Sequence, residues 1–404
     1  MSPRPTRSVD HSWRKQLWTA VGCAAFGVLV HRAGPVVPLE LQTIGLAIGL
    51  IGASFLLAWA ADAGEAVFSG GLVLAVIALV AVLPEFVIEI RFAYVQQIEL
   101  VSANLTGATR LLLMGATALP LVVAYLARRR GQGAAAFELA TTRRLELGML
   151  LIVALFAVQI VVRGTLTLAD GVILVALYVI YARRVQGTPE EEPAVVGVPA
   201  GLLTLRPERR RPVIVSLIVG AGAVVLAIAN PFADALLATG TSFGLDPYFL
   251  IQSVVPLATE APEYVIVAVL VAHHRPAQGL ALFLASSVSQ WTLGMGALPL
   301  AYLAGGGGPS MPLAGREQVE IALTIALTLF AVAALALLKP ERVDAAIVVA
   351  VMAFQFAYPA TFVRVAAAFI LLVFAIDLLF DRRRAIRPLY RAVFGRGTAG
   401  QPNI

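Results

Sequence analysis

Long runs of apolar residues are the feature that most constrains how this chain can fold. A helix needs about 20 apolar residues to cross the hydrocarbon core of a bilayer, and about twelve such runs lie between charged or Gly/Pro-rich breaks. Charged residues make up only 13% of the chain, against about 25% in soluble proteins. A soluble enzyme and a disordered chain are thereby excluded, and the sequence predicts an all-α polytopic membrane protein. The expected helices cover residues 16–32, 40–62, 66–97, 98–127, 145–163, 167–184, 212–240, 246–273, 276–304, 317–338, 342–358 and 361–381.

Basic residues cluster on alternate loops between these helices. The clusters include Arg128 to Arg130, Arg209 to Arg211 and Arg382 to Arg384. The positive-inside rule therefore predicts that both termini and every basic loop face the cytoplasm, as in a multi-pass protein of the bacterial inner (plasma) membrane. Because topology explains the net charge of +6, we expect the lipid bilayer as partner and no nucleic acid. The intervening loops hold almost no basic residue apart from Arg316 and lie near residues 33–39, 164–166, 241–245, 304–316 and 359–361.

A polar, proline-rich stretch divides the chain into two halves. Such a composition is typical of a linker. The expected order is a cytoplasmic segment over residues 1–15, a first membrane half over 16–185, a cytoplasmic linker over 186–211, a second membrane half over 212–381 and a basic cytoplasmic tail over 382–404.

The two halves contain related sequences. Pro-Glu-Phe-Val-Ile at 84–88 recurs as Pro-Glu-Tyr-Val-Ile at 262–266, and Ala-Leu-Pro-Leu at 118–121 recurs at 297–300. The helices that carry the two Pro-Glu pairs are the third and the eighth, so the copies run in opposite directions through the membrane. Inverted repeats are the usual construction of secondary transporters. We therefore expect two inverted-topology repeats of about five transmembrane helices each, plus one or two extra helices.

The glutamates of the two Pro-Glu pairs and two neighbouring glutamates fall inside expected helices. An ionised carboxylate near the bilayer centre costs about 2.5 to 3.5 kcal/mol or more, so it needs a partner, a proton or a bound cation. Glu85 and Glu89 share one helical face, as do Glu260 and Glu263. A proline directly before Glu85 and before Glu263 leaves a backbone carbonyl free one turn earlier. Carboxylates beside free carbonyls suit a hard cation, and a site for a cation is therefore predicted.

Two other interpretations of these residues stay open at this point. The glutamates could be protonated, or paired with Arg91 and Arg110, and only hold helices together. Polar side chains on the following helices, such as Asn104 in the first copy and Ser286 and Gln290 in the second, could complete a coordination shell or serve as ordinary packing residues.

With these residues, the two copies resemble the alpha-repeats of the sodium/calcium exchanger (cation/calcium antiporter) superfamily. Its first motif, of the type Gly-Thr-Ser-x-Pro-Glu, stands here as Ala-Val-Leu-Pro-Glu at 81–85 and as Thr-Glu-Ala-Pro-Glu at 259–263. Its second motif, of the type Gly-Asn-x-x-Gly-Ser-Asn, is vestigial at 104–108 and 286–290. By this resemblance the repeats cover about residues 66–127 and 246–304.

The resemblance implies ten core helices in two inverted halves and exchange of calcium for sodium or protons by alternating access. These ions are transported, so no permanently bound cofactor is expected. The residues implied or proposed to bind ions are Glu85, Glu263, Glu260, Glu89, Thr259, Ser286, Gln290 and Asn104, with Glu85 and Glu263 as the metal ligands and Arg110 as a charge partner.

The chain departs from the family pattern at several of these positions. Val82 and Ala108 replace polar residues of the first copy, while Glu260 adds a carboxylate in the second. Arg110 is a fixed cation that could neutralise a glutamate or stand where a sodium ion would bind. This argues against sodium coupling more than against exchange itself.

The sequence thus favours a secondary active cation antiporter in which the same carboxylates bind either one divalent cation or the coupling ions. The alternatives are a proton-coupled carrier of another cation and a transport-inactive membrane scaffold. An intramembrane enzyme is disfavoured, because the sequence contains no His-Glu-x-x-His, Gly-x-Ser-x-Gly or P-loop motif.

Overall fold

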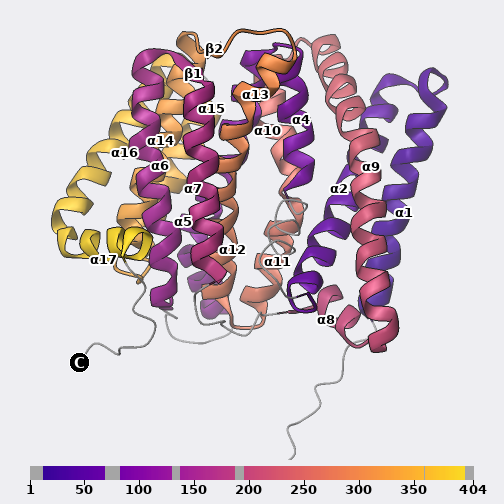
Figure 1. Cartoon of the computed structure of the whole chain (residues 1–404), viewed down its shortest axis with the longest axis horizontal. Coiled ribbons are helices and arrows are strands. Elements are labelled where there is room, and N and C mark those ends of the chain that lie inside the picture. The colour runs from indigo at the N-terminus through magenta and orange to yellow at the C-terminus, as the bar shows by residue number, and fades with distance from the viewer. Residues whose placement is uncertain (1–11, 69–81, 130–136, 187–194, 359, 396–404) are drawn as a thin grey trace, which may run out of the picture. The chain divides into compact units, whose positions relative to one another are not determined.

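The computed structural model describes residues 12–68, 82–129, 137–186, 195–358 and 360–395, and most of them are helical (Figure 1). Among these residues, six helices are long and apolar enough to cross a membrane, and two more that meet at a bend of 50° together form a seventh candidate span. The predicted all-α polytopic fold is thereby confirmed. The six are α2 (Leu39–Glu65), α5 (Ile98–Arg129), α6 (Arg144–Arg163), α9 (Pro207–Ser242), α14 (Gly315–Leu335) and α16 (Thr361–Asp381), and the bent pair is α10 (Pro247–Thr259) with α11 (Ala261–Ala272).

Other expected helices are also present, and one of them is interrupted by a π-helical turn. They are α1 (Ser12–Ala33), α4 (Leu83–Tyr94), α7 (Leu168–Gln186), α15 (Arg342–Ala357), and the succession of α12 (Pro276–Ser289), the π-helical turn η3 (Gln290–Gly294) and α13 (Met295–Ala304). Of the helix expected over 66–97, residues 69–81 lie outside the described residues, as do 1–11, 187–194 and 396–404 of the expected terminal segments and linker.

One compact unit combines residues up to Val87 with Glu191–Phe243. It contains α1, the short helix η1 (Gly34–Val36), α2, α8 (Val198–Leu203) and α9. Here α2 packs between α1 and α9. The helices α1 and α2 approach closely at two glycines, since a Cβ added to Gly27 would lie 2.5 Å from the Cα of Gly49. Small residues of this kind allow close backbone packing in membranes.

A second compact unit comprises Ile88–Glu190 and Gly244–Ile404. Its helix contacts are symmetric between the first repeat (α5, α6, α7) and the second (α12 with α13, α14, α15). α6 packs on α14 and α5 packs on α12. The contact of α7 with α13 corresponds to the contact of α15 with α5. A pseudo-twofold axis in the membrane plane produces such a pattern. The unit also contains β1 (Thr165–Thr167), β2 (Ser310–Pro312), the short helix η2 (Thr141–Arg143) and the C-terminal helix α17 (Arg383–Phe394).

Loops from the two repeats meet at both ends of this unit. At one end β1 pairs antiparallel with β2, with Leu166 opposite Met311. At the other end of α6 the N–H of Leu139 donates to the carbonyl of Leu338 (2.8 Å), and Lys339 is 2.8 Å from Glu138. Two loops poor in basic residues, those with β1 and β2, thus share one end of this unit, here called the ribbon end, and the loops with Leu139 and Leu338 share the other, here called the basic end. This is the alternation that the charge pattern predicts.

The glycine contact between α1 and α2 gives a first prediction. Gly27→Ala should lower the free energy of unfolding by about 1–3 kcal/mol, because its Cβ would overlap the backbone of α2. Gly22→Ala on the same helix is the control, since a Cβ there has no atom within 4 Å, and it should raise stability by up to about 1 kcal/mol. Thermal unfolding of both variants in detergent tests this. Equal melting temperatures would contradict it.

Candidate functional site

The first two carboxylates lie on α4, one turn apart on one face. The side chains of Glu85 and Glu89 are only 3% and 1% exposed. The helix α5, which follows α4 after a tight turn, supplies Asn104, whose Nδ2 donates to Oε1 of Glu89 (3.2 Å). Asn104 is fully buried. The structure therefore brings two of the predicted site residues into direct contact.

The second pair of carboxylates lies where α10 ends and α11 begins. Pro256 and Pro262 flank Glu260, and Pro262 has no N–H to give to the carbonyl four residues earlier. The helices bend by 50° at this point, and the N–H of Glu260 still donates to the carbonyl of Pro256 (2.9 Å). Thr259, Glu260 and Glu263 are all buried. A broken helix with carboxylates and backbone carbonyls at the break is how many transporters form cation sites.

Close contacts fix the broken helix against α5. A Cβ at Gly107 would collide with the carbonyl oxygen of Gln252 on α10. The hydroxyl of Tyr264 on α11 donates to the carbonyl of Leu111 (2.5 Å). The carboxylates of the second copy are thus carried by a segment that packs along α5, the helix that bears Asn104.

Gln290 lies at the first position of η3, inside the interrupted helix of the second repeat. It is 1% exposed, and neither Nε2 nor Oε1 of its amide has a hydrogen-bond partner among the described residues. π-helical turns occur often at functional sites, and a buried amide without partners is costly unless it binds something. Ser286, one turn earlier, is half-buried. The amide oxygen of Gln290 is therefore available as a ligand for a hard cation.

Arg110 contacts none of the four predicted carboxylates through any observed ion pair. It forms a buried ion pair with Glu320 of α14, whose other oxygen pairs with Arg364 of α16. The Nε of Arg110 donates to Oγ1 of Thr324 (2.9 Å), and Gln252 donates to Glu320 (3.0 Å). We call Arg110, Glu320 and Arg364 the charge triad. Two guanidinium groups and one carboxylate give it a formal charge of +1.

Sequence reasoning missed Glu320 and Arg364. Both fall inside expected membrane helices, 317–338 and 361–381. The criterion that selected Glu85, an ionisable residue in an apolar span, would have selected them as well. What the sequence does not contain is the pairing, because Arg110 and Glu320 are 210 residues apart.

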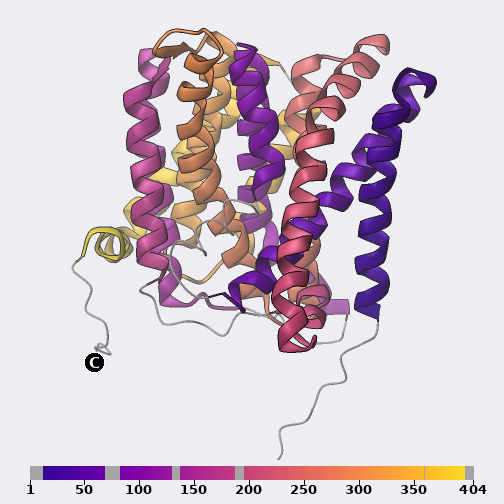
Figure 2. The ribbon, with the colours of Figure 1, turned by 45° about the vertical axis from the view of Figure 1, so that its right-hand side comes forward.

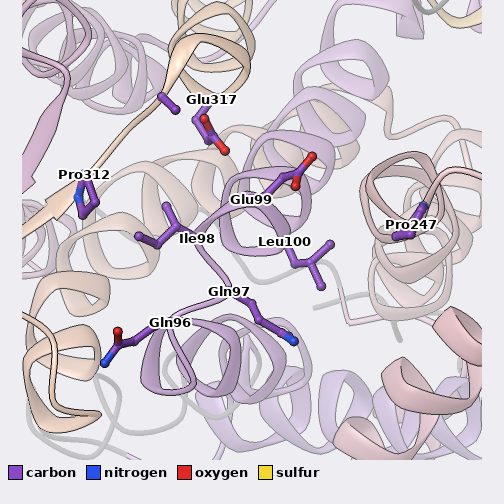
Figure 3. A pocket seen from close by; sticks show the side chains of 9 residues that line it. Gln96, Gln97, Ile98, Glu99, Leu100, Pro247, Pro312 and Glu317 are labelled. Carbon is purple, nitrogen blue, oxygen red and sulfur yellow. The ribbon is translucent and has the colours of Figure 1, made fainter.

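A pocket of about 560 Å³ opens at the ribbon end of the second unit. Figure 3 shows the side chains of Gln96, Gln97, Glu99 and Glu317 around it. Glu99 Oε1 is 3.1 Å from Arg316, whereas Oε2 of the buried Glu317 has no hydrogen-bond partner among the described residues. Asn104 lies about 7.5 Å further along α5 than Glu99. The pocket thus has two glutamates and two glutamines among apolar lining residues, and it lies at the end of α5 that precedes Asn104.

Two features of the predicted site stay predictions: the proximity of Glu85 to Glu263 and the full set of metal ligands. Glu85 belongs to the first compact unit and Glu263 to the second, so their proximity stays a prediction. Within the described residues, no group of three or more His, Cys, Asp or Glu side chains could hold a metal ion. A calcium ion would therefore need amide, hydroxyl or backbone oxygens besides carboxylates.

The sequence and the structure both match known proteins. A family model described as sodium/calcium exchanger protein matches residues 41–185 and 213–382. A search of curated proteins gave no match. Among solved structures, the crystal structure of the H+/Ca2+ exchanger CAX has 31% sequence identity and a TM-score of 0.87, and the match covers 95% of this chain and 98% of that one.

Two solved structures with lower sequence identity share the fold. The Ca2+/H+ antiporter YfkE is 14% identical with a TM-score of 0.58, over 90% of this chain and 100% of that one. The sodium-calcium exchanger NCX_Mj is 16% identical with a TM-score of 0.52, over 84% and 98% of the two chains. These matches confirm the predicted architecture of two inverted repeats.

The charge triad gives a second prediction. Glu320→Gln leaves two buried guanidinium groups without their counter-ion, so it should destabilise the protein by about 3–5 kcal/mol. The same change at Glu99, which is 55% exposed beside Arg316, should cost about 0–1 kcal/mol. Thermal unfolding in detergent compares the two. If the two variants melted together, the triad would not be a structural ion pair.

Proposed function

Because the chain belongs to the sodium/calcium exchanger family, we propose that it carries calcium across the membrane in exchange for protons. The family consists of transporters, and cation/calcium antiport is its general activity. The observation that carries the proposal is the duplicated Pro-Glu pair, each copy with its glutamate buried in the first turn of a helix.

We assign the metal-ligand role to Glu85 and Glu263. Glu89, Glu260, Thr259, Ser286, Gln290 and Asn104 complete the proposed set of oxygen and amide groups. Three observations support this assignment: the burial of the carboxylates, the contact of Asn104 with Glu89, and the amide of Gln290, which has no hydrogen-bond partner in the described part of the chain.

The coupling follows from competition for the same carboxylates. One calcium ion or two protons neutralise two carboxylates equally well, and an uncompensated carboxylate is costly in the membrane interior. A carrier that reorients only with its site neutralised must therefore exchange one ion for the other. Each ion shifts the equilibrium only through its own differential binding to the two orientations.

The charge triad favours protons over sodium as the coupling ion. Arg110 is six residues beyond Asn104 on α5, about 9 Å along the helix. A fixed guanidinium and the apolar side chains of Val82 and Ala108 disfavour a site for a monovalent metal ion, which needs several oxygen ligands. Protonation of a carboxyl group needs none. The identity of 31% to an H+/Ca2+ exchanger agrees with this choice.

We further propose that the basic end faces the cytoplasm of a bacterial cell and that the membrane halves are residues 16–185 and 212–381. The positive-inside rule supports the orientation. The two matched stretches of the family model, 41–185 and 213–382, support the division.

Calcium uptake into proteoliposomes tests the function. With an imposed pH gradient the wild type should accumulate radioactive calcium, whereas a sodium gradient should drive no uptake. Glu85→Gln and Glu263→Gln should each abolish transport, because a neutral amide cannot exchange a cation for a proton. Glu138→Gln, on an exposed loop, is the control and should transport normally. Wild-type flux in both site variants would place the ion site elsewhere, and absence of uptake by the wild type would leave a transport-inactive scaffold.

Gln290 gives a separate prediction on affinity. Gln290→Leu keeps a similar side-chain volume but removes the oxygen, so it should raise the KM for calcium about tenfold. Gln278→Leu, about 18 Å away along the same helical stretch, is the matched control, since its amide oxygen also lacks a partner. Equal KM values for the two variants would remove Gln290 from the site.

A further inference from the structure

The C-terminal helix α17 differs in direction and composition from the rest of the second unit. It follows α16 with one residue between them and runs across the ends of α6 and α7 rather than along them (Figures 1 and 2). Four of its twelve residues are exposed arginines. They are Arg383, Arg384, Arg387 and Arg391.

One face of α17 is fixed to the protein. Leu389 and Val393 are fully buried, and a Cβ added to Gly148 of α6 would lie 2.6 Å from the carbonyl oxygen of Leu389. At the end of the helix, Arg184 donates to the carbonyl of Gly395 (2.6 Å). At its start, Arg382 donates to the carbonyl of Ala334 (2.7 Å) and pairs with acidic side chains of the neighbouring loop and helix. The orientation of α17 is therefore held at both ends.

Another face of α17 presents aromatic rings outward. Tyr390 and Phe394 are 62% and 45% exposed, and their ring centroids are 5.1 Å apart. Tyr390 follows Arg387 by three residues and Phe394 follows Arg391 by three, so the exposed surface of α17 combines aromatic rings with arginines. Helices rich in arginine that also expose aromatic rings occur in the membrane interface. Aromatic rings are enriched at that depth.

A pocket of about 350 Å³ lies between α17 and the start of α6. Among the described residues it is lined by Thr141, Arg144, Pro388, Arg391 and Ala392, none of which is acidic. Within the described part of the chain, neither Arg144 nor Arg391 has an observed side-chain hydrogen bond or ion pair. Two guanidinium groups without counter-ions, beside a hydroxyl group, match the chemistry of a phosphate.

We propose that this pocket binds the headgroup phosphate of an anionic phospholipid and that α17 is an interfacial helix. Arg144 and Arg391 donate to the phosphate oxygens, and the hydroxyl of Thr141 adds a donor. Tyr390 and Phe394 lie against the acyl chains, and the remaining arginines attract neighbouring anionic headgroups. Basic pockets beside membrane helices on the cytoplasmic side bind anionic lipids by the same chemistry. The inference does not depend on which ions the protein transports.

Lipid retention by the purified full-length protein tests the site. Native mass spectrometry after detergent washing should show phosphatidylglycerol bound to the wild type and phosphatidylcholine absent. Arg144→Gln with Arg391→Gln should reduce bound phosphatidylglycerol about tenfold. Arg128→Gln with Arg129→Gln, two exposed arginines at the end of α5, removes the same charge elsewhere and should retain the lipid. Equal retention by the two double variants, or equal retention of the two lipids, would overturn the proposal.

A single variant and a melting-temperature measurement test the same site if the double variant does not fold. Arg391 is exposed, so Arg391→Gln alone should fold if the double variant does not, and it should still lower retention. Phosphatidylglycerol should raise the melting temperature of the wild type by several degrees and that of the pocket variant by less. Inorganic phosphate at the same concentration should not reproduce the shift; if it does, the site binds soluble anions rather than lipid.

The accessibility of spin labels tests whether α17 lies in the membrane interface. A nitroxide label at Tyr390→Cys, in a Cys23→Ala background, should be relaxed by oxygen, which partitions into the bilayer. A label at Arg384→Cys, about 120° around the helix from Tyr390, should be relaxed by a water-soluble nickel complex. Relaxation of both labels by the nickel complex alone would place α17 in water and reject the interfacial helix.

Discussion

The cost of a buried charge determines how this fold is organised. An ionised carboxylate inside the membrane must be neutralised, and the second compact unit contains carboxylates in two different settings. Glu320 is held between two guanidinium groups, an arrangement that cannot exchange its counter-ions. Glu89 receives a hydrogen bond from Asn104, which orients the carboxylate without adding a charge. The first setting is structural, and only the second is compatible with binding and releasing a cation.

A helix break positions two of the carboxylates that we propose as ion ligands. Backbone polar groups in a membrane must be satisfied within the protein, and irregular backbone survives only inside it or beside a polar cavity. The break at Glu260 satisfies this condition because α10 and α11 pack along α5, through the contacts of Gln252 and Tyr264. α5 itself continues through Pro120 without a break. The rigid helix therefore supports the broken one, and the break supplies both carboxylates and backbone oxygens.

The sequence predicted the parts of the structure that depend on local pattern. Apolar runs predicted the spans, and alternating basic loops predicted which loops lie together, as the pairing of Leu166 with Met311 confirms. The sequence predicts a helix over 246–273, whereas the structure has a 50° bend at Glu260, because prolines indicate a weak point in a helix but not the angle of the bend. The partner of Arg110 could not be predicted, since an ion pair across 210 residues depends on packing. The helix α17 was read as a basic tail, although its apolar residues recur at helical spacing.

The two repeats have diverged toward opposite charges. The first copy lacks polar side chains at Val82 and Ala108 and carries Arg110, whereas the second has gained Glu260 beside Glu263 and has Gln290 on the next helix. Arg110 and the pair Glu260 and Glu263 belong to the same compact unit. The surplus positive charge of the triad therefore lies in the same unit as these carboxylates. In the proposed exchanger this charge favours the ionised form of the two glutamates, so that a divalent cation or protons need neutralise only part of their charge.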